Sequence, residues 1–315
     1  MKTYQLKNGS RVSRIAYGCM NLGQLDAVED RERLIDTALA AGINFYDHAD
    51  IYGAGYCETV FGELLKRNPA WRDHMLIQSK CGIRFAGDTY GDSAPSRYDF
   101  SFEHIMRSVD GILERLQIEQ LDILLLHRPD LLMEPDEVAR AFDALSSSGK
   151  VKDFGVSNFD GRQIELLQRS LDQDLIVNQV EVSLLHAELI AEGARVNTGQ
   201  GFAPASGTLD YCRLNNISIQ AWSPVAGGRL FGPAADAPQH IHDASALVYE
   251  LADRYATNAS AILLAWLLRH PAGIQPVLGT TNPERLRQST EADGIELSRE
   301  DWYGLLERAQ GRSVP

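Results

Sequence analysis

The sequence predicts a (β/α)8 barrel that spans residues 1–315 as a single domain, with a β-hairpin before the barrel and long loops at its mouth. Apolar runs of strand length alternate eight times with segments of helical periodicity, a pattern typical of parallel strands joined by crossover helices. An open sheet with a dinucleotide site would carry Gly-x-Gly-x-x-Gly after its first strand. The stretch from Gly18 to Gly23 lacks that spacing, which favours the closed barrel.

The N-terminal residues predict the hairpin, and eight apolar runs predict the barrel strands. Asn8-Gly9 separates two short extended segments, residues 3–6 and 11–12, which is the signal of a two-residue turn. A hairpin at this position is expected to cap the barrel floor. The strands are then expected at residues 15–18, 44–46, 75–79, 121–126, 151–156, 175–179, 217–222 and 274–278.

Apolar residues that recur every three or four positions predict the helices between these strands. Gly42 ends the first, residues 30–41, and Ser101 is expected to cap the third, whose apolar face runs to Leu116. The remaining helices are expected at residues 59–66, 138–145, 162–169, 248–255, 259–270, 283–292 and 301–308. Long loops that wall the substrate site are expected at residues 84–98, 184–207 and 223–243.

Composition and charge restrict the classes of partner. The formal net charge of -13 disfavours nucleic acid and anionic membranes, and no apolar run is long enough to predict a transmembrane helix. The N-terminus lacks the apolar core of a signal peptide, and the four scattered cysteines indicate neither disulfides nor a zinc site. We therefore expect a reduced, cytoplasmic protein, a monomer or weak homo-oligomer without a metal. His240 and His242 form a His-x-His pair in an expected lid, but no Cys or carboxylate cluster accompanies them, so we expect them to face solvent.

Four polar residues stand where predicted strands end. Asp47, Lys80 and His127 each follow an apolar run, and Tyr52 lies five residues beyond the aspartate. Because the carboxyl ends of barrel strands converge on one mouth, these side chains are expected to meet in one pocket. Taken singly, they also fit ordinary roles: a snorkelling lysine, a capping carboxylate, a loop aromatic and a satisfied core histidine. Together they favour acid–base chemistry, in which the lysine lowers the pKa of the phenol, the carboxylate holds the lysine charged and the imidazole binds a substrate oxygen.

A second group of candidate site residues lies in the last predicted strand–helix loop. Asn282 fits an N-cap before Pro283, and with two neighbouring hydroxyls and Arg285 this helix start forms an anion site. In barrels, phosphate sites commonly follow strands seven and eight. The loop after strand seven, residues 223–230, adds two glycines and Arg229. Ordinary turn chemistry is the alternative for both loops, but together they supply the positive potential that an acidic chain needs to bind a phosphorylated cofactor.

Other strand ends carry groups that fit a cofactor. Trp222 could stack on a flat ring or pack in the core. Ser157, Asn158 and Gln179 could bind a carboxamide or satisfy backbone groups at the strand ends.

Taken in order, these features closely resemble the aldo-keto reductase family over nearly the whole chain, and within it the bacterial YdhF-like oxidoreductases. Each motif alone is weak, but their order and spacing are highly specific. The motifs are Asp47-x-Ala49-x-x-Tyr52-Gly53, Ser79-Lys80, Leu125-Leu126-His127-Arg128-Pro129-Asp130, Gly155-Val156-Ser157-Asn158-Phe159, Asn178-Gln179-x-Glu181, Trp222-Ser223-Pro224 and Gly279-Thr280-Thr281-Asn282-Pro283-Glu284.

The resemblance implies NADPH-dependent reduction of an aldehyde or ketone to an alcohol by direct hydride transfer, with Tyr52 as the general acid. NADH is an alternative, because the family often has Glu-Asn where Gln288 and Ser289 stand and a lysine in place of Gly279. It is the weaker one, because Arg285 keeps NADPH ahead. In this family the 2′-phosphate would be held by two threonines and an arginine of the last loop. The residues implied to bind the cofactor are Met20, Ser157, Asn158, Gln179, Trp222, Ser223, Val225, Gly227, Arg229, Thr280, Thr281, Arg285, Gln288 and Ser289.

Two other functions stay open on the sequence. Barrel enzymes also use a lysine such as Lys80 to form a Schiff base with a carbonyl substrate, as lyases do. The chain could instead be a nucleotide-sensing subunit that holds NADPH tightly with negligible turnover. The sequence does not identify the small-molecule carbonyl substrate, because the walls of the site are loops.

Overall fold

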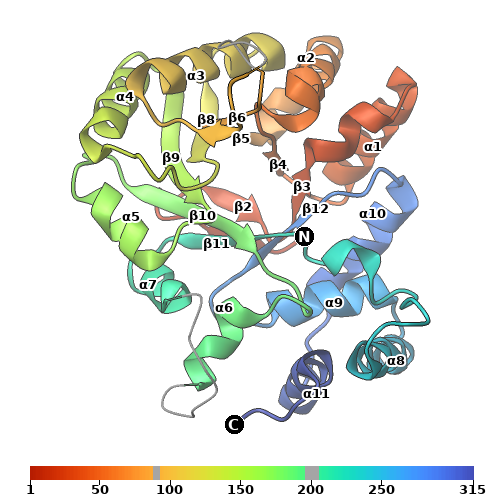
Figure 1. Cartoon of the computed structure of the whole chain (residues 1–315). Helices are drawn as coiled ribbons and strands as arrows, with labels where there is room; N and C mark the ends of the chain where they lie inside the picture. Colours follow the sequence, from red (N-terminus) through yellow and green to blue (C-terminus); the bar gives the residue numbers. More distant parts are fainter. Residues whose placement is uncertain (88–92, 196–205) are drawn as a thin grey trace.

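Eight parallel strands close into a barrel, as predicted (Figure 1). The computed structural model describes residues 1–87, 93–195 and 206–315. The first and last barrel strands pair with each other, with Ala16 opposite Val277, and this pairing closes the ring. In chain order the barrel strands are β3 (Ala16–Gly18), β4 (Phe45–Asp47), β5 (Leu76–Cys81), β8 (Leu121–Leu126), β9 (Val151–Ser157), β10 (Leu175–Glu181), β11 (Ser218–Trp222) and β12 (Gln275–Leu278).

Helices surround the strands (Figure 1). The helix α3 illustrates why they form: its buried apolar residues recur on one face, and Ser101 caps its start by accepting a hydrogen bond from the His104 N–H at 3.4 Å. The helices are α1 (Val28–Ala40), α2 (Tyr56–Arg67), α3 (Phe102–Leu116), α4 (Pro135–Ser147), α5 (Gly161–Gln168), α6 (Glu188–Ala191), α7 (Thr208–Leu214), α8 (Gln239–Arg254), α9 (Ala259–Leu268), α10 (Pro283–Thr290) and α11 (Arg299–Gln310).

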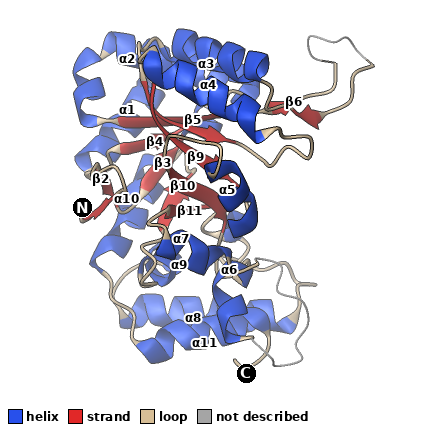
Figure 2. Ribbon diagram, turned by 90° about the vertical axis from the view of Figure 1, so that its left-hand side faces the viewer, coloured by secondary structure: helices blue, strands red, loops and turns tan. Residues whose placement is uncertain are grey.

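The two ends of the barrel carry different attachments. Figure 2 shows β6 (Ile83–Arg84) beyond one end of the strands and β2 (Arg11–Ser13) at the other end. Each belongs to a small antiparallel pair, β6 with β7 (Arg97–Tyr98) and β2 with β1 (Thr3–Gln5). Because parallel strands all end on the same side, the segments that follow β4, β5 and β8 meet at the end that carries β6, called the mouth below.

The N-terminal hairpin closes the opposite end, the floor, as predicted. Leu6 is buried against apolar residues of the barrel interior, among them Phe45. The hairpin loop is longer than the predicted two-residue turn, because the Gly9 N–H donates to the Leu6 carbonyl at 2.9 Å and the turn therefore begins one residue earlier. The hairpin pairing continues to Leu6, whose N–H donates to the Ser10 carbonyl at 2.9 Å, and the Leu6 side chain turns into the floor.

A larger apolar core fills the space between the strands and the helices. Figures 1 and 2 show α8 and α11 side by side at the edge of the molecule. Trp266 of α9 and Trp302 of α11 stack with ring centroids 5.1 Å apart. Each indole N–H also donates to the backbone carbonyl of the other tryptophan, at 3.1 and 2.9 Å. This reciprocal pair attaches the last helix to α9.

The lid predicted for His240 and His242 needs correction. Both histidines lie, partly exposed, in the first turns of α8, which begins at Gln239 and not near the predicted start at Val248. Ile241 packs against the core about two turns before Val248, the first apolar residue that the sequence interpretation counted. No group of His, Cys, Asp and Glu side chains in the described part of the chain could hold a metal ion.

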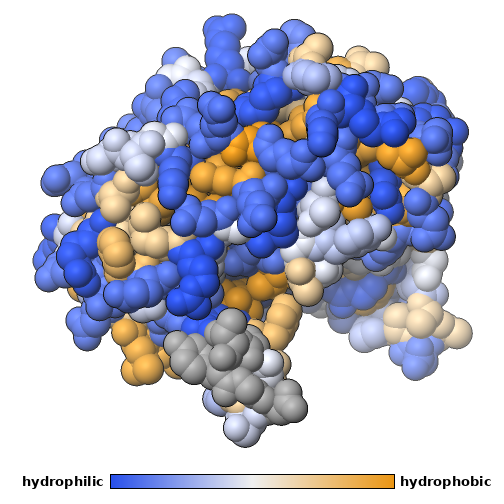
Figure 3. All heavy atoms as spheres, turned by 90° about the horizontal axis from the view of Figure 1, so that it is seen from above, coloured by the Kyte–Doolittle hydropathy of each residue, from blue (hydrophilic) through white to orange (hydrophobic). Residues whose placement is uncertain are grey.

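The predicted substrate walls lie only partly within the described residues. Residues 88–92 of the first wall and 196–205 of the second are outside them. The described parts contain β6, β7 and α6, where the sequence interpretation placed no regular structure. Across residues 1–87, 93–195 and 206–315, no helix is long and apolar enough to cross a membrane. Figure 3 shows a mostly hydrophilic face with small apolar patches.

All four cysteines are free and buried. Burial raises the pKa of each thiol, and it raises the pKa of Cys212 to about 12. A thiol with such a pKa stays protonated and behaves as a small apolar side chain.

Candidate active site

The structure brings Asp47, Tyr52, Lys80 and His127 together at the mouth. The Lys80 Nζ atom donates to Asp47 Oδ2 at 2.8 Å and to Tyr52 Oη at 3.0 Å. It also donates to the His48 backbone carbonyl at 2.8 Å, so all three ammonium protons have acceptors. The His127 ring stands edge-on to the Tyr52 ring, with centroids 6.1 Å apart. The ammonium thus links the carboxylate to the phenol.

Strand register explains this convergence. Asp47, the last residue of β4, lies opposite Gln78 of β5. Lys80 follows two residues later on β5, and side chains two residues apart in a strand point to the same face. After β4 the chain turns back so that Tyr52 reaches the lysine. Gly55 in this turn has φ of 90°, and an added β-carbon would lie 2.8 Å from a neighbouring side chain, so the turn requires glycine.

Burial and charge set the protonation of the phenol. Burial lowers the pKa of the Lys80 ammonium, but Asp47 and Tyr52 raise it, and the net pKa lies above the ordinary lysine value. Burial raises the pKa of Tyr52, Lys80 lowers it and Asp47 raises it, and the net pKa is also raised. The lysine therefore lowers the pKa of the phenol, as the sequence interpretation held, but burial outweighs this effect. At neutral pH an ammonium stands beside a protonated phenol.

His127 is neutral in this structure. Burial lowers its pKa to about 2, and the positive charges of Lys80 and Arg128 act in the same direction. Its Nδ1 atom has no hydrogen-bond partner among the described residues. A neutral imidazole can donate one hydrogen bond to a carbonyl oxygen without serving as the proton source.

A cleft of about 600 Å³ opens over Asp47, Tyr52 and His127, with Lys80 buried behind them. Trp222 Nε1 donates to Asn158 Oδ1 at 3.0 Å, and Asn158 Nδ2 donates to Ser157 Oγ at 2.9 Å, so these bonds fix the indole and the amide in the cleft wall. Asn158 has φ of 63° and Ser223 has φ of 51°. Left-handed backbone is uncommon for serine, and such strain tends to persist at functional sites.

The start of α10 forms another wall of the cleft. Asn282 caps this helix as predicted, because its side chain accepts a hydrogen bond from the Arg285 N–H at 3.0 Å. Thr280 and Arg285 line the cleft. Among the described residues the Arg285 guanidinium has no ion-pair partner, whereas Arg287 pairs with Glu284 at 2.7 Å. Arg285 is therefore free to bind an anion at the helix start.

Most residues implied to hold a cofactor lie along this cleft. Arg229, Thr281 and Gln288 do not line it, and the Arg229 side chain instead donates to the Ala226 carbonyl at 3.2 Å. The implied residues that line the cleft are Met20, Ser157, Asn158, Gln179, Trp222, Ser223, Val225, Gly227, Thr280, Arg285 and Ser289.

Sequence interpretation missed several residues of the site. The Arg128 guanidinium lies over the Trp222 ring, 5.9 Å from its centroid, and lines the cleft. Its position directly after the strand-end histidine His127 was the signal available in the sequence. Ser260 also lines the cleft, but it lies in α9, and only tertiary packing brings that helix to the mouth. Gln78 donates to Asp47 Oδ1 at 2.6 Å, and its polarity within an apolar strand was the signal.

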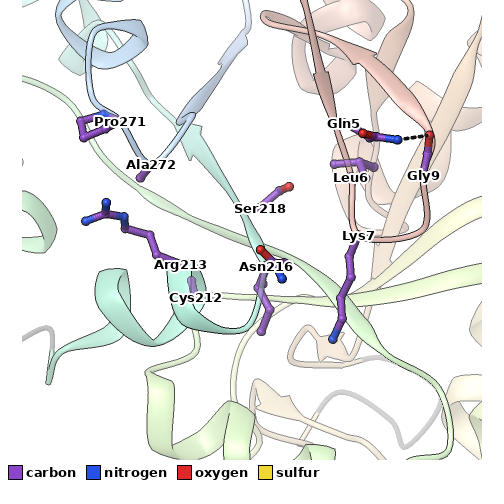
Figure 4. Close-up of a pocket in the computed structure, with 11 residues that line it drawn as sticks. Gln5, Leu6, Lys7, Gly9, Cys212, Arg213, Asn216, Ser218, Pro271 and Ala272 are labelled. Carbon is purple, nitrogen blue, oxygen red and sulfur yellow. Dashed lines mark hydrogen bonds between the residues drawn. The ribbon is translucent and has the colours of Figure 1, made fainter.

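A second hollow, of about 530 Å³, lies at the floor. Figure 4 shows the hairpin residues Gln5 and Lys7 on one side of it and Arg213 and Asn216 on the other. Lys7 forms an ion pair at 2.7 Å with an aspartate outside the hollow. None of the described residues that line it is a histidine or a carboxylate. This hollow therefore lacks the histidine and the carboxylate that line the cleft at the mouth.

Comparisons with known proteins agree with the fold. The model of the aldo/keto reductase family matches residues 14–307, which include every barrel strand. The chain belongs to the aldo/keto reductase family and is an oxidoreductase of that family. The resemblance seen in the sequence motifs is thereby confirmed.

Several bacterial relatives are similar over most of the chain. The uncharacterized oxidoreductase YcsN of Bacillus subtilis is 34% identical, and the 6-dehydroglucose reductase of Agrobacterium fabrum is 36% identical, each with 100% of both chains covered. The oxidoreductase YdhF of Escherichia coli is 39% identical, with 89% of this chain and 88% of YdhF covered. Among solved structures, the thermostable aldo-keto reductase Tm1743 is similar in fold, with a TM-score of 0.77, 22% identity, and 98% of this chain and 100% of the other covered.

Proposed function

We propose that this oxidoreductase reduces an aldehyde or a ketone to an alcohol with NADPH, and that Tyr52 donates the proton. The observation that carries the proposal is the line of contacts from Asp47 through Lys80 to the phenol, which lines the cleft. When bound, NADPH supplies the hydride. The protein must then provide a proton for the oxygen and stabilise the charge that develops there.

The four residues at the mouth can carry out these tasks. The Tyr52 phenol is protonated and gives its proton to the carbonyl oxygen as that oxygen gains negative charge. The Lys80 ammonium stabilises the phenolate that remains, and Asp47 balances the ammonium. The neutral imidazole orients the carbonyl oxygen toward the phenol.

The chemistry of the cleft fits NADPH. The flat indole of Trp222 suits the nicotinamide ring, and the polar groups of Ser157, Asn158 and Gln179 suit its carboxamide. Thr280 and the unpaired Arg285 would hold the phosphate that distinguishes NADPH from NADH. The cleft therefore offers partners for both ends of the cofactor.

The geometry disfavours the Schiff-base alternative. Lys80 has no exposed surface and does not line the cleft. A Schiff base requires a neutral amine that reaches the substrate, but this ammonium has three acceptors and a raised pKa. A subunit that only senses NADPH would not need a buried ion pair beside a phenol, and single-turnover oxidation of bound NADPH by a carbonyl compound separates the two functions.

The names of two relatives suggest which substrates to test first. The proteins of Agrobacterium fabrum and Novosphingobium aromaticivorans, 36% and 35% identical, are both named 6-dehydroglucose reductase. A screen for this protein should therefore set sugar aldehydes beside aromatic aldehydes, ketones and quinones, with NADPH oxidation as the signal.

The change Tyr52→Phe tests the proposal directly. We expect kcat to fall by roughly 10²–10⁴-fold, the scale of general acid catalysis, while the Kd for NADPH stays nearly unchanged. Tyr56→Phe is the matched control, because the same change is made four residues away at a side chain that is 48% exposed and does not line the cleft. Near wild-type turnover in Tyr52→Phe would remove this phenol from the mechanism.

A further inference from the structure

Four buried glutamines on four different strands form a continuous chain of hydrogen bonds inside the barrel. Gln220 lies at its centre: its Oε1 atom accepts from Gln78 Nε2 at 2.9 Å and from Gln179 Nε2 at 3.0 Å. Its own Nε2 atom donates to Gln275 Oε1 at 3.0 Å, and Gln275 Nε2 donates to the Ser13 carbonyl at 2.6 Å. All four side chains are almost completely buried.

The chain ends on the carboxylate of the active site. Gln78 Nε2 and Gln179 Nε2 both donate to Asp47 Oδ1, at 2.6 and 2.9 Å. The other carboxylate oxygen, Oδ2, accepts from Lys80. The two oxygens of Asp47 thus have separate partners, amides on one and the ammonium on the other.

The direction of every amide in this chain is determined from both ends. The Ser13 carbonyl can only accept, so Gln275 must turn its NH₂ group toward it and its oxygen toward Gln220. Gln220 must then donate to Gln275, which leaves its oxygen facing the other two glutamines. Those two glutamines must donate, and an ionised carboxylate at their far side accepts from them as well.

The unsatisfied Oε1 atom of Gln78 indicates that the amides are oriented so that their NH₂ groups face the Asp47 carboxylate. Gln78 uses its NH₂ group for both Asp47 and Gln220, and its Oε1 atom is buried without a hydrogen-bond partner among the described residues. A buried unpaired carbonyl costs about 1–3 kcal/mol. Barrel interiors are usually filled with branched apolar side chains, and the floor of this barrel is filled in that way. The glutamines are thus a departure from the usual interior, at the level of Asp47.

We propose that Gln220 is a positioning residue for the catalytic ion pair. Without a hydrogen bond of its own to Asp47, it holds the amides of Gln78 and Gln179 so that they donate to Oδ1 and leave Oδ2 to Lys80. Gln275 supports it from the floor side. The catalytic consequence rests on the proposed function, whereas the coupling between Gln220 and Asp47 does not depend on turnover.

A double-mutant cycle between Gln220→Leu and Asp47→Asn tests the coupling. Residues that are far apart and share no partner normally contribute additively to folding, whereas residues joined by one hydrogen-bond network show a coupling energy. We expect Gln220→Leu to lower the folding equilibrium constant at least about fivefold more in the wild-type background than in the Asp47→Asn background, because only the ionised carboxylate forms charge-assisted bonds to the oriented amides. Denaturant titration of the four proteins measures this difference without substrate or cofactor.

Turnover provides the second readout. With NADPH and 4-nitrobenzaldehyde, Gln220→Leu should lower kcat about tenfold in the wild-type background, on the scale expected for a misplaced catalytic group, and have little effect on the residual rate of Asp47→Asn. Gln275→Leu should show the same coupling more weakly. It takes the place of Gln220→Leu in both measurements if the Gln220→Leu protein does not fold.

Asn178→Leu is the matched control. This buried amide neighbours Gln179 in sequence, but it donates to the Phe159 carbonyl at 2.9 Å and lies outside the glutamine chain. Asn178→Leu should lower the free energy of unfolding by the same amount in the wild-type and Asp47→Asn backgrounds. Additive behaviour of both Gln220 and Gln275 would overturn the proposal. Coupling in folding together with a wild-type protein that reduces no carbonyl compound would uphold the positioning role and refute the proposed function instead.

Discussion

Lys80 carries a positive charge on a side chain with no exposed surface, so its neighbours decide how the site works. We expect Lys80→Met to lower kcat by roughly 10²-fold or more, because the phenolate of Tyr52 loses the charge that stabilises it. The sign of the accompanying pH effect follows from the same contact. Lys80 lowers the pKa of Tyr52, so its removal should move the alkaline limb of the kcat–pH profile to higher pH. An alkaline limb that stays at the same pH would contradict the tuning role, and Lys66→Met, a change at an exposed lysine of α2, is the control.

Arg285 separates cofactor identity from catalysis. A charge-assisted contact to a phosphate contributes about 1.5–3 kcal/mol. Arg285→Ala should therefore raise the Kd for NADPH by roughly ten- to a hundredfold and leave the Kd for NADH nearly unchanged. Added salt should weaken NADPH binding by the wild type more than by the variant. Fluorescence titration with the two cofactors measures the effect.

Arg287→Ala is the control on the same helix. Arg287 is held by Glu284 at 2.7 Å and does not line the cleft. Its removal should leave both dissociation constants unchanged. Equal weakening of NADPH and NADH in Arg285→Ala would place Arg285 away from the 2′-phosphate.

At the scale of elements, the end of α8 offers a stability test. The helix ends in a Schellman motif: the Thr257 N–H donates to the Ala252 carbonyl at 2.9 Å, and the Ala256 N–H donates to the Asp253 carbonyl at 3.2 Å. The exposed Ala256 has φ of 51°, which costs an L-residue about 1–2 kcal/mol. Ala256→Gly should therefore raise the free energy of unfolding by about 1 kcal/mol. Denaturant unfolding measures it.

The control for Ala256→Gly is the same substitution at an alanine with right-handed helical backbone. Ala139 is a partly exposed residue in the interior of α4. Ala139→Gly should lower the free energy of unfolding by roughly 0.5–1 kcal/mol, because glycine loses more backbone entropy in a helix. If Ala256→Gly also destabilised the protein, the left-handed conformation of this residue would not be a source of strain.

The sequence allowed most elements to be predicted because each carries a local signal. Ser101, Asn282 and the apolar period of α3 mark their helices directly, and the structure confirms them. The early start of α8 was missed because its first turn carries two histidines and a single apolar residue. The hydrogen-bond partners of Gln78 could not be predicted from the sequence, since only strand register and barrel closure bring Asp47 and Gln220 to its side.

At the scale of the whole molecule, buried neutral histidines make stability depend on pH. Burial lowers the pKa of His48 to about 3 and of His127 to about 2. Because unfolded histidine takes up a proton near pH 6.5, the unfolded state binds more protons below that pH. The free energy of unfolding should thus fall as the pH drops from about 6.5 toward 3, by about 1.4 kcal/mol per pH unit for each histidine.

His48→Leu isolates one of these contributions. The His48 ring is fully buried, packs edge-on against Phe61 at 4.5 Å, and has no hydrogen bond on either nitrogen among the described residues. The leucine variant should show a shallower slope between pH 6 and 4. Asp50 acts in the opposite direction, because burial raises its pKa to about 7 and it stabilises the fold toward acid pH. A slope unchanged in His48→Leu would mean that His48 takes up its proton equally in the folded and unfolded states.

The burial of all four thiols has a practical consequence for anyone handling the protein. Thiolates are the species that maleimides and peroxides attack, and none of these side chains readily becomes one. The folded chain should therefore tolerate storage without a reductant. A cysteine introduced at the exposed Lys66 would be its one reactive thiol, so a dye or a surface linker could be attached there on the outer end of α2 without labelling the catalytic mouth.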